Sequence, residues 1–435
     1  MNKNFFKNIH AVHFIGIGGI GMSALARMMV HEGKKVTGTN DWESPSTLDG
    51  LRDQGVHIYL DRDISHISPD TDVIIYSTAW DQNEKDFMNQ VRALSTPVLT
   101  YAEALGLASQ GKYTIAISGT HGKTTTTAMI AEMLVTTKKD PTVIVGSLLK
   151  GSGSNFIAGE SNLFVVEACE YQRSFLNLSP EILIITNIDN DHLDYYKDIE
   201  DIISAFHELA MKVPKHGFVV ADLHDQNIQK ALLGTVANIV DYSKVGETKH
   251  FDLSVPGDHN IKNAQAALAV AGILNITEDE ALAALRNFQG TWRRMEYKGE
   301  LSNGTKVYDD YAHHPTEIRA SLQGFRAKHP EGRIRIVFQP HLYSRTKLLL
   351  NDFAGSFSDA DEVIVAPIYA AREKSDLEIS AEILTQEILK YHSSVRAGEN
   401  LLSIESYLRD TVRAGDIIIT MGAGDVNKIG EHLLP

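Results

Sequence analysis

Short runs of apolar and β-branched residues alternate with longer segments of helical spacing along almost the whole chain. This alternation is typical of α/β folds with mainly parallel sheets, because each helix returns the chain to the same end of the sheet. We find no internal repeat and no low-complexity segment. The clearest strand candidates are residues 11–15, 73–77, 114–118, 164–167, 182–186, 218–221, 333–338, 363–366 and 417–421.

Two glycine-rich turns divide the first part of this pattern. Each follows a predicted strand and opens a predicted helix, at Gly16–Gly21 and at Gly119–Gly122. Since each such unit normally organises its own sheet, two turns predict two nucleotide-binding domains in series. A third set of strands begins near Lys306, after a helix that ends at a glycine, Gly290. We therefore expect three α/β domains, at residues 1–102, 103–291 and 292–435.

The composition agrees with this domain count and argues against some classes of function. A chain of 435 residues with 43% hydrophobic and 22% charged residues can form several full-sized cores. Its formal net charge of −15 argues against a nucleic-acid binder or an anionic-membrane binder, which normally carries a basic excess. The single cysteine, Cys169, excludes an intrachain disulfide, and the N-terminal residues lack the apolar core of a signal peptide. We expect a cytoplasmic enzyme, a monomer or a homodimer.

The first glycine turn fits the dinucleotide-binding pattern G-x-G-x-x-G. Its glycines allow backbone N–H groups to approach a pyrophosphate at the start of a helix. Asp41 lies 20 residues after Gly21, a spacing that suits a carboxylate bonded to a ribose hydroxyl. The same geometry accepts NAD or a UDP-sugar, and a turn that needs glycine only for packing is the third alternative.

The second glycine turn is a shortened phosphate loop. Gly119-Thr120-His121-Gly122-Lys123-Thr124 has Ile117 where the full pattern has its first glycine. The physical requirements are retained, because backbone amides at Gly119–Lys123 can surround phosphate oxygens. Lys123 can reach the β- and γ-phosphates, and the Thr124 hydroxyl can bind Mg²⁺. We predict ATP binding here.

Acidic residues follow the next two strands. Glu167 ends one strand, at the sheet edge where ligands gather, and is the first candidate for holding Mg²⁺. The other strand leads into a dense polar loop with His192 as a possible metal ligand and Asp191 or Asp194 as its partner. Pairing of Glu167 with a lysine, and a polar turn that caps a helix, are the structural alternatives.

Four further clusters are candidates for ligand binding. His259 and Asn263 are four residues apart and share one face of a helix, where they could bond a base. The neighbouring Arg293 and Arg294 could clamp phosphates. Two polar loops of the third domain, 309–315 and 339–346, could converge on one substrate. Their histidine spacings do not match a structural zinc site.

Taken together, these segments resemble the Mur ligase family, most closely its alanine-adding members. The resemblance covers almost the whole chain in the family order, and the ordered set is more specific than any single motif. The matching stretches are Gly16–Ser23, Ser118–Thr127, Glu167–Glu170, Ile185–Asp194, Pro256–Asn263, Phe288–Glu296, Asp309–Ile318, Phe338–Thr346, Ile368–Glu373 and Met421–Asp425.

The resemblance implies a Rossmann-like N-terminal domain for the UDP-substrate, a central phosphate-loop ATPase domain and a Rossmann-like C-terminal domain for the amino acid. The implied reaction joins L-alanine to UDP-N-acetylmuramate with ATP and Mg²⁺. Expected substrate contacts are Gly16, Gly18, Gly19, Gly21, Met22, Ser23, Asp41, Ser77, Tyr311, His313 and Arg345. Expected ATP contacts are Gly119, Thr120, His121, Gly122, Lys123, Thr124, Thr125, His259, Asn263, Arg293, Arg294 and Asp310.

The metal ligands implied by the same resemblance are Thr124, Glu167 and His192. The implied catalytic residues are Lys123, His192, His313 and Arg345.

Two departures from the family pattern concern the metal and the amino acid. The family commonly has Glu-Ala-Asp-Glu-Ser-Asp where this chain has residues 167–172, Glu-Ala-Cys-Glu-Tyr-Gln. It also commonly has an arginine where this chain has Leu342. A buried amino-acid carboxylate needs a cation, so Lys347 and Arg372 are candidates to replace that arginine.

Three rival functions stay open at this level. An NAD-dependent oxidoreductase would use the first glycine turn but leave the second unexplained. A regulatory ATP-binding module would leave the histidine and arginine clusters of the third domain without a role. A ligase of the same family could add a different amino acid or a whole peptide.

Overall fold

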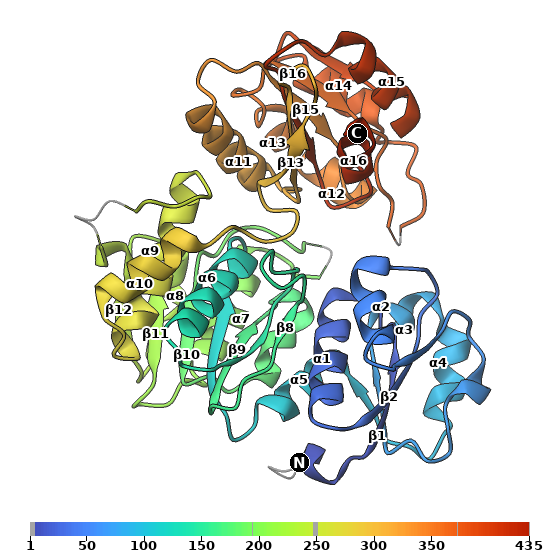
Figure 1. The fold of residues 1–435 in the computed structure, drawn as a ribbon, viewed down its shortest axis with the longest axis vertical. Coiled ribbons are helices and arrows are strands. Elements are labelled where there is room, and N and C mark those ends of the chain that lie inside the picture. Colours follow the sequence, from blue (N-terminus) through green and yellow to red (C-terminus); the bar gives the residue numbers. More distant parts are fainter. Residues whose placement is uncertain (1–4, 194, 247–250, 372, 435) are drawn as a thin grey trace. The chain divides into compact units, whose positions relative to one another are not determined.

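The computed structural model describes residues 5–193, 195–246, 251–371 and 373–434. The chain folds into two compact units. Unit 1 comprises 1–252 and 262–288, and unit 2 comprises 253–261 and 289–435. Unit 1 holds two sheets and unit 2 holds one, and each sheet carries its own helices (Figure 1).

The first sheet, blue in Figure 1, has five parallel strands in the order β3-β2-β1-β4-β5. The strands at residues 11–15 and 73–76 in its centre are almost entirely buried and, apart from His13, carry apolar or aromatic side chains, as expected where helices cover both faces. The elements are η1 Phe5–Asn8, β1 Ala11–Ile15, α1 Ile20–His31, β2 Lys35–Thr39, α2 Pro45–Arg52, β3 His57–Tyr59, η2 Ile64–His66, β4 Val73–Tyr76, α3 Ala79–Asn83, α4 Lys85–Arg92, β5 Val98–Thr100 and α5 Tyr101–Ser109.

The second sheet has seven strands in the order β12-β11-β10-β6-β9-β7-β8. All neighbouring strands are parallel except β7 and β8, which are antiparallel. In this order β6 and β10 lie side by side near the centre of the sheet. The elements are β6 Tyr113–Ser118, α6 Lys123–Thr136, β7 Thr142–Ile144, β8 Phe156–Ile157, β9 Leu163–Glu167, η3 Tyr171–Asn177, β10 Ile182–Ile185, α7 Ile199–Ala210, β11 Phe218–Ala221, α8 Gln226–Ala231, β12 Asn238–Asp241, η4 Tyr242–Lys244, α9 Asp258–Ile273 and α10 Glu278–Asn287.

One hydrophobic cluster joins these two sheets within unit 1. It includes Phe14 and Leu25 around the first sheet, Phe164 and Leu183 around the second, and Leu105 of α5. Thr100 and Glu103 form a capping box at the start of α5. The start of α5 is therefore specified by local residues, and α5 contributes Leu105 to the core that the two sheets share.

The third sheet, in unit 2, has six strands in the order β13-β14-β18-β15-β16-β17, and only β13 runs antiparallel to its neighbour. Apolar clusters cover both of its faces. The elements are β13 Glu296–Glu300, β14 Lys306–Asp310, α11 Pro315–Lys328, β15 Ile334–Phe338, α12 Tyr343–Leu348, α13 Leu350–Ala354, β16 Glu362–Val365, α14 Ala381–Ile388, β17 Val395–Ala397, α15 Leu401–Thr411, β18 Ile417–Met421 and α16 Asn427–Leu433.

The predicted three-domain α/β fold with mainly parallel sheets is confirmed, and the nine predicted strands coincide with observed strands to within one residue at each end. The sequence pattern did not single out the short strands β3, β5, β7, β8, β12, β13 and β17. Within the described part of the chain, none of the helices combines the length and the apolar character that a bilayer crossing requires.

Candidate active site

The second glycine turn closes between β6 and α6, at the centre of the second sheet. Gly122 adopts a left-handed conformation, with φ of +83°, directly before Lys123 begins α6. A Cβ atom at Gly122 would lie 2.6 Å from Oδ1 of Asn263, so the position requires glycine for two independent reasons. The N-cap residue of α6 is Gly122, which has no side chain that could cap the start of this helix. Its first N–H groups are therefore suited to an anion such as a phosphate.

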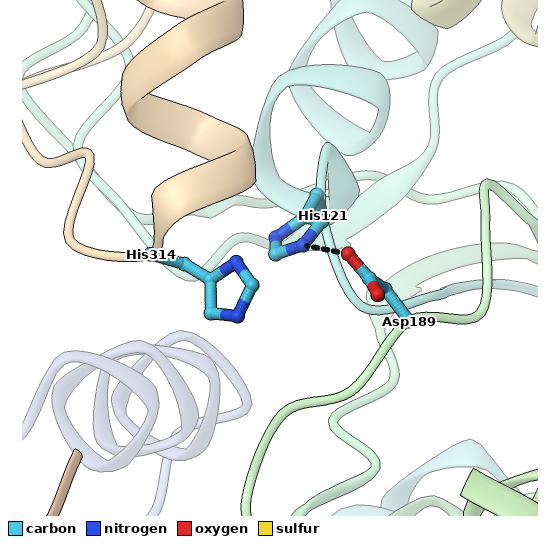
Figure 2. Close-up of side chains that lie close together, drawn as sticks. All are labelled: His121, Asp189 and His314. Atoms are coloured by element: carbon cyan, nitrogen blue, oxygen red, sulfur yellow. Dashed lines mark hydrogen bonds and ion pairs between the residues drawn. The ribbon is translucent and has the colours of Figure 1, made fainter. Parts of the chain in front are cut away.

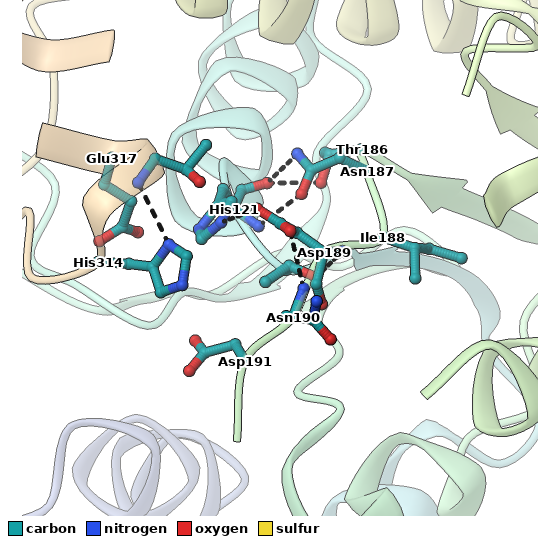
Figure 3. Close-up of polar contacts among 12 residues, drawn as sticks. His121, Thr186, Asn187, Ile188, Asp189, Asn190, Asp191, His314 and Glu317 are labelled. Carbon is teal, nitrogen blue, oxygen red and sulfur yellow. Dashed lines mark hydrogen bonds and ion pairs between the residues drawn. The ribbon is translucent and has the colours of Figure 1, made fainter. Parts of the chain in front are cut away.

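The loop that follows β10 supports this turn (Figure 3). The backbone N–H of Thr120 donates to the carbonyl of Asn187 at 3.0 Å, and that of His121 donates to Asn187 Oδ1 at 2.9 Å. Thr186 Oγ1 donates to the His121 carbonyl at 2.6 Å. Two of the amides expected to surround phosphate thus already have protein acceptors. The amides at the start of α6 remain the main donors for a ligand.

His121 is held in place by the same loop. Its Nε2 lies 3.4 Å from Oδ2 of Asp189 (Figure 2). Thr120 Oγ1 accepts a hydrogen bond from the Asp189 N–H at 2.9 Å. The turn and the loop after β10 form one hydrogen-bonded structure, which fixes the shape of the second glycine turn.

Lys123 makes three hydrogen bonds within unit 1. Its Nζ donates to the carbonyls of Gly119 at 2.6 Å and Thr120 at 2.9 Å, and to Glu170 Oε1 at 2.9 Å. Burial alone would lower the pKa of Lys123, but the adjacent Glu170 carboxylate outweighs burial and raises the pKa above its ordinary value. Lys123 is therefore a fixed positive charge at neutral pH.

Two carboxylates lie beside Thr124 and Lys123. Glu167 Oε1 accepts from the Thr124 hydroxyl at 3.0 Å, and Oε2 accepts from the Gly146 N–H at 2.9 Å. Glu170 is 2% exposed, and its Oε1 lies 3.6 Å from Nε2 of His192. Its other oxygen, Oε2, is buried without a hydrogen-bond partner among the described residues. An unpaired buried carboxylate oxygen is costly, and a cation would relieve that cost.

The donor types around this oxygen suit Mg²⁺. A threonine hydroxyl and two carboxylates are hard oxygen ligands, which this ion prefers. Sequence reasoning found Glu167, Thr124 and His192 but did not single out Glu170, although it lies three residues beyond Glu167. Asn187 was also missed, and its position directly after an apolar strand was the available signal.

The first glycine turn is stabilised by uncharged contacts. The Gly16 N–H donates to the Thr39 carbonyl at 2.8 Å, and the Gly18 N–H donates to Asn40 Oδ1 at 3.1 Å. Asn40, which is fully buried, is therefore the residue that contacts the turn. Asp41 instead lies 3.4 Å from Nη2 of Arg62.

The other residues expected to contact the sugar nucleotide are near the same turn. Ser23 Oγ donates to the Ile20 carbonyl at 3.0 Å. It accepts a hydrogen bond at 2.8 Å from Nδ2 of Asn155, which directly precedes β8. The Ser77 N–H donates to the carbonyl of Ile15 at the end of β1. Met22 is buried, while Gly19 and Gly21 are partly exposed at the start of α1.

His259 and Asn263 both lie in α9, which begins within their motif at Asp258. Asn263 Oδ1 accepts from the buried Thr126 hydroxyl at 3.1 Å, which links α9 to α6 inside unit 1. His259 belongs to unit 2, where burial lowers its pKa to about 4. Thr125 lies in the first turn of α6.

In unit 2, Arg293 is committed to internal contacts. Its guanidinium donates from Nε to Asp309 Oδ2 at 2.7 Å, and from Nη1 and Nη2 to the carbonyls of Gly424 and Gly422. Arg294 lies over the Tyr311 ring, with Nη1 3.7 Å from Glu317 Oε1. Arg293 therefore stabilises the end of the third sheet.

The polar residues after β14 and β15 gather at one edge of that sheet. The rings of His313 and Tyr311 are 5.2 Å apart and those of His313 and His341 are 6.0 Å apart. His341 Nδ1 lies 3.3 Å from Nη1 of Arg345. The two loops thus bring Tyr311, His313 and Arg345 near one another, with His341 as a further member that sequence reasoning did not single out.

Asp310 ends β14 and is buried beside Ser321. Burial raises the pKa of Asp310 to about 6, and the hydrogen bond from the Ser321 hydroxyl opposes this shift only in part. The side chain therefore titrates closer to neutral pH than an ordinary aspartate does.

The two positions proposed to replace the missing arginine differ in what the structure shows. Leu342 is buried and is the N-cap residue directly before α12, with φ of +70°. Lys347 Nζ is paired with Asp376 at 3.2 Å and with Glu378. Arg372 lies outside the described residues, as does Asp194.

Comparisons with known proteins agree with this architecture. Three family models match in order. They are the Mur ligase family catalytic domain at residues 11–113, the Mur ligase middle domain at 117–251, and the Mur ligase glutamate ligase domain at 293–424.

Full-length relatives and solved structures are also similar. The UDP-N-acetylmuramate–L-alanine ligase of Clostridium kluyveri is 41% identical over 100% of both chains, and that of Clostridium acetobutylicum is 41% identical over 97% of both. The crystal structure of UDP-N-acetylmuramate-alanine ligase from Thermotoga maritima has a TM-score of 0.81 at 27% identity and covers 97% of this chain and 98% of its own. A murein peptide ligase from Psychrobacter arcticus, with a TM-score of 0.72 at 24% identity over 98% of both chains, shares the fold.

Proposed function

The chain belongs to the Mur ligase family, and from this premise we propose that it joins L-alanine to UDP-N-acetylmuramate with ATP, in peptidoglycan precursor synthesis. The reaction forms an amide bond. The proposed place of action is the cytoplasm, and the proposed state is a monomer or a homodimer.

The observation that carries the proposal is the group around the start of α6. Lys123, Thr124 and Glu167 lie at an uncapped helix start, directly after the central strand of the second sheet. This arrangement suits the binding and transfer of a phosphoryl group. The similarity to the full-length ligases is thus accompanied by a group of residues in this chain that could carry out the chemistry.

An unactivated carboxylate is a poor electrophile, and ATP supplies the activation. The substrate carboxylate attacks the γ-phosphorus and forms an acyl phosphate, while ADP leaves. Lys123 would exchange its hydrogen bonds to Glu170 and to the Gly119 and Thr120 carbonyls for hydrogen bonds to the oxygens of the γ-phosphate. Its ammonium group would then stabilise the negative charge on the phosphoryl group during transfer. Because Glu170 keeps Lys123 protonated beforehand, no proton has to be supplied when ATP binds.

Thr124, Glu167 and His192 are the proposed magnesium ligands, and Glu170 fits beside them through its unpaired buried oxygen. When bound, Mg²⁺ would neutralise charge on the phosphate oxygens. The protein contributes the orientation of the donors, since Gly146 fixes one oxygen of Glu167 and Thr124 the other.

The amine of L-alanine then attacks the acyl phosphate and releases phosphate. In unit 2, Tyr311, His313 and Arg345 are proposed to place the amino acid, with His313 as proton acceptor or as an orienting group. The His313 Nδ1 lies 2.9 Å from the Tyr311 carbonyl and 3.4 Å from Glu317 Oε2, so its orientation is already constrained.

The sugar nucleotide is proposed to meet the first glycine turn. The N–H groups at the start of α1 have no side-chain cap and suit a diphosphate. Asn40, which accepts a hydrogen bond from the Gly18 N–H, is added to the proposed contact set, which already includes Asp41 and Ser77.

Phosphate release from ATP tests the proposal. The assay contains Mg²⁺ and UDP-N-acetylmuramate, with and without L-alanine. Release that requires both substrates, with the expected amide in the mass spectrum, is the expected result. Release that requires the sugar nucleotide but ignores L-alanine would remove the amine from the proposal, and glycine, L-serine and a tripeptide would be tried in its place.

A further inference from the structure

A cavity with a basic residue lies beside the second half of α1 in unit 1. Its arginine, Arg27, contacts Thr47, and the Thr47 hydroxyl donates to the Gly18 carbonyl of the first glycine turn at 2.8 Å. The cavity, of about 380 Å³, is lined by Arg27, Val30, His31, Gln54, Ser154, Phe156 and Ala158. The lining comes from the second half of α1, the residues after α2, and β8 with its flanking residues. This volume lies at the lower end of the range of about 300–1,000 Å³ that is typical of small-ligand sites.

Arg27 is the unusual member of this lining. It is 8% exposed, and its guanidinium donates from Nη2 to the Thr47 carbonyl at 3.3 Å. Its Nε is buried and has no hydrogen-bond partner among the residues that the structure describes. Among the residues that the structure describes, no carboxylate pairs with Arg27, and burial lowers its pKa with no opposing acidic neighbour.

A buried guanidinium without a counter-charge is costly, because the protein loses its hydration and gains little in return. The fold nevertheless makes room for it. A Cβ at Gly50 of α2 would lie 2.6 Å from Nη2 and 2.7 Å from Nη1 of Arg27, so the guanidinium packs directly on the Gly50 backbone. The position is therefore built around the cation.

The remaining lining suits an anion with a small organic part. His31 and Gln54 offer polar groups, whereas Val30 and Phe156 offer apolar surface. The Ser154 hydroxyl already donates to the Phe156 carbonyl at 2.9 Å. His31 lies 3.9 Å from Glu160, whose side chain is 89% exposed, so this carboxylate does not neutralise Arg27. We propose that the cavity binds a phosphate group, either free or carried by a small phosphomonoester, with Arg27 as its main ligand.

Titration calorimetry with inorganic phosphate and with glycerol 3-phosphate tests this site. The nucleotide site is first filled with a non-hydrolysable ATP analogue, so that the phosphate loop does not contribute. Arg27→Met should weaken binding of both probes at least tenfold, because a charge-assisted hydrogen bond is lost. Arg52→Met, which removes a partly exposed arginine already paired with Glu43 and Asp49, should leave binding unchanged.

The two probes distinguish the sources. Tighter binding of glycerol 3-phosphate identifies a phosphomonoester, and equal binding identifies free phosphate. A crystal grown with tungstate, a heavy analogue of phosphate, should show its anomalous peak at the Arg27 guanidinium. A peak confined to the phosphate loop, or equal affinities of Arg27→Met and the unaltered protein, would overturn the proposal.

A second variant guards against misfolding of Arg27→Met. Ala158 is exposed, lines the cavity and lies outside the apolar core, so Ala158→Trp places a bulky ring at the cavity without disturbing the core. It should abolish binding of glycerol 3-phosphate while the circular dichroism spectrum stays unchanged. Undiminished binding in this folded variant would also refute the site.

Discussion

The two glycine-rich turns of unit 1 have the same topology but different surroundings. Each follows a central parallel strand and opens a helix without a side-chain cap. Around the first, at Gly16–Gly21, the neighbours are Asn40 and Trp80, which carry no charge. Around the second, Lys123 is bound to Glu170, and Thr124 to Glu167. Under the proposed function, the same backbone geometry would serve to hold a phosphate group in one case and to transfer it in the other.

The strongest test of this contrast is Lys123→Ala. Turnover should fall by about 10³-fold or more, because the charge that stabilises the transferring phosphoryl group is lost. The measurement is steady-state phosphate release, with circular dichroism to verify the fold. Lys35→Ala, at an exposed position of β2, is the matched control and should retain full activity. Normal turnover of Lys123→Ala would refute the phosphate-loop assignment.

Glu167→Gln should have the next largest effect. The amide keeps the shape but removes the charge beside Thr124, so turnover should fall roughly 100-fold. The Mg²⁺ concentration for half-maximal activity should rise as well. A Mg²⁺ titration of the variant measures both, with Glu160→Gln at an exposed position as the control. An unchanged Mg²⁺ requirement would remove Glu167 from the metal site.

The first sheet should respond to pH through His13. Burial lowers the pKa of His13 to about 4, and its ring nitrogens contact Thr37 and Thr39. Below pH 6.5 the unfolded chain binds a proton that the folded chain does not. Stability contributed by neutral His13 is therefore present above pH 6.5 and is lost as the pH falls towards 4. Between pH 6.5 and pH 5 the loss should be about 1.6 kcal/mol.

Urea unfolding measures this loss. In a Trp292→Phe background the remaining tryptophans, Trp42 and Trp80, both lie in the region of the first sheet. His13→Gln should flatten the pH dependence of the unfolding free energy by that amount. Parallel pH profiles for the two proteins would show that His13 is not the titrating group.

The smallest effects are expected from glycine substitutions in the first turn. They should distinguish a glycine that the backbone conformation requires from one that lets a ligand approach closely. Gly16 has φ of +81°, and a Cβ there would approach Trp80 Nε1 at 2.6 Å. Gly16→Ala should therefore destabilise the protein by about 1–2 kcal/mol. Gly19→Ala meets only ordinary contacts, so its stability should change by less than about 1 kcal/mol. If Gly19 lets the sugar nucleotide approach, its variant should raise KM without lowering the melting temperature. An unchanged KM would favour a packing role.

The long apolar strands and both glycine turns could be predicted from sequence, because burial on two faces and left-handed turns leave local signals. The chain's membership of an α/β ligase family followed from the order of its motifs. The contact between Lys123 and Glu170 could not be predicted in this way, since 47 residues separate the two partners and nothing local specifies the pairing. Asp41 illustrates the same limit, because spacing alone did not indicate Arg62 beside it. The roles of the site residues and the boundaries 102 and 291 stay predictions.

The continuity of α9, yellow in Figure 1, has a consequence for biosynthesis. Its first residues, up to Ile261, belong to unit 2, whereas Lys262 onwards belongs to unit 1. The ribosome therefore releases the opening segment of unit 2 before unit 1 is complete, and that segment must wait for residues 289–435. A fragment that begins at residue 289 would lack Leu253–Ile261, so limited proteolysis at this point should not yield an intact C-terminal folding unit.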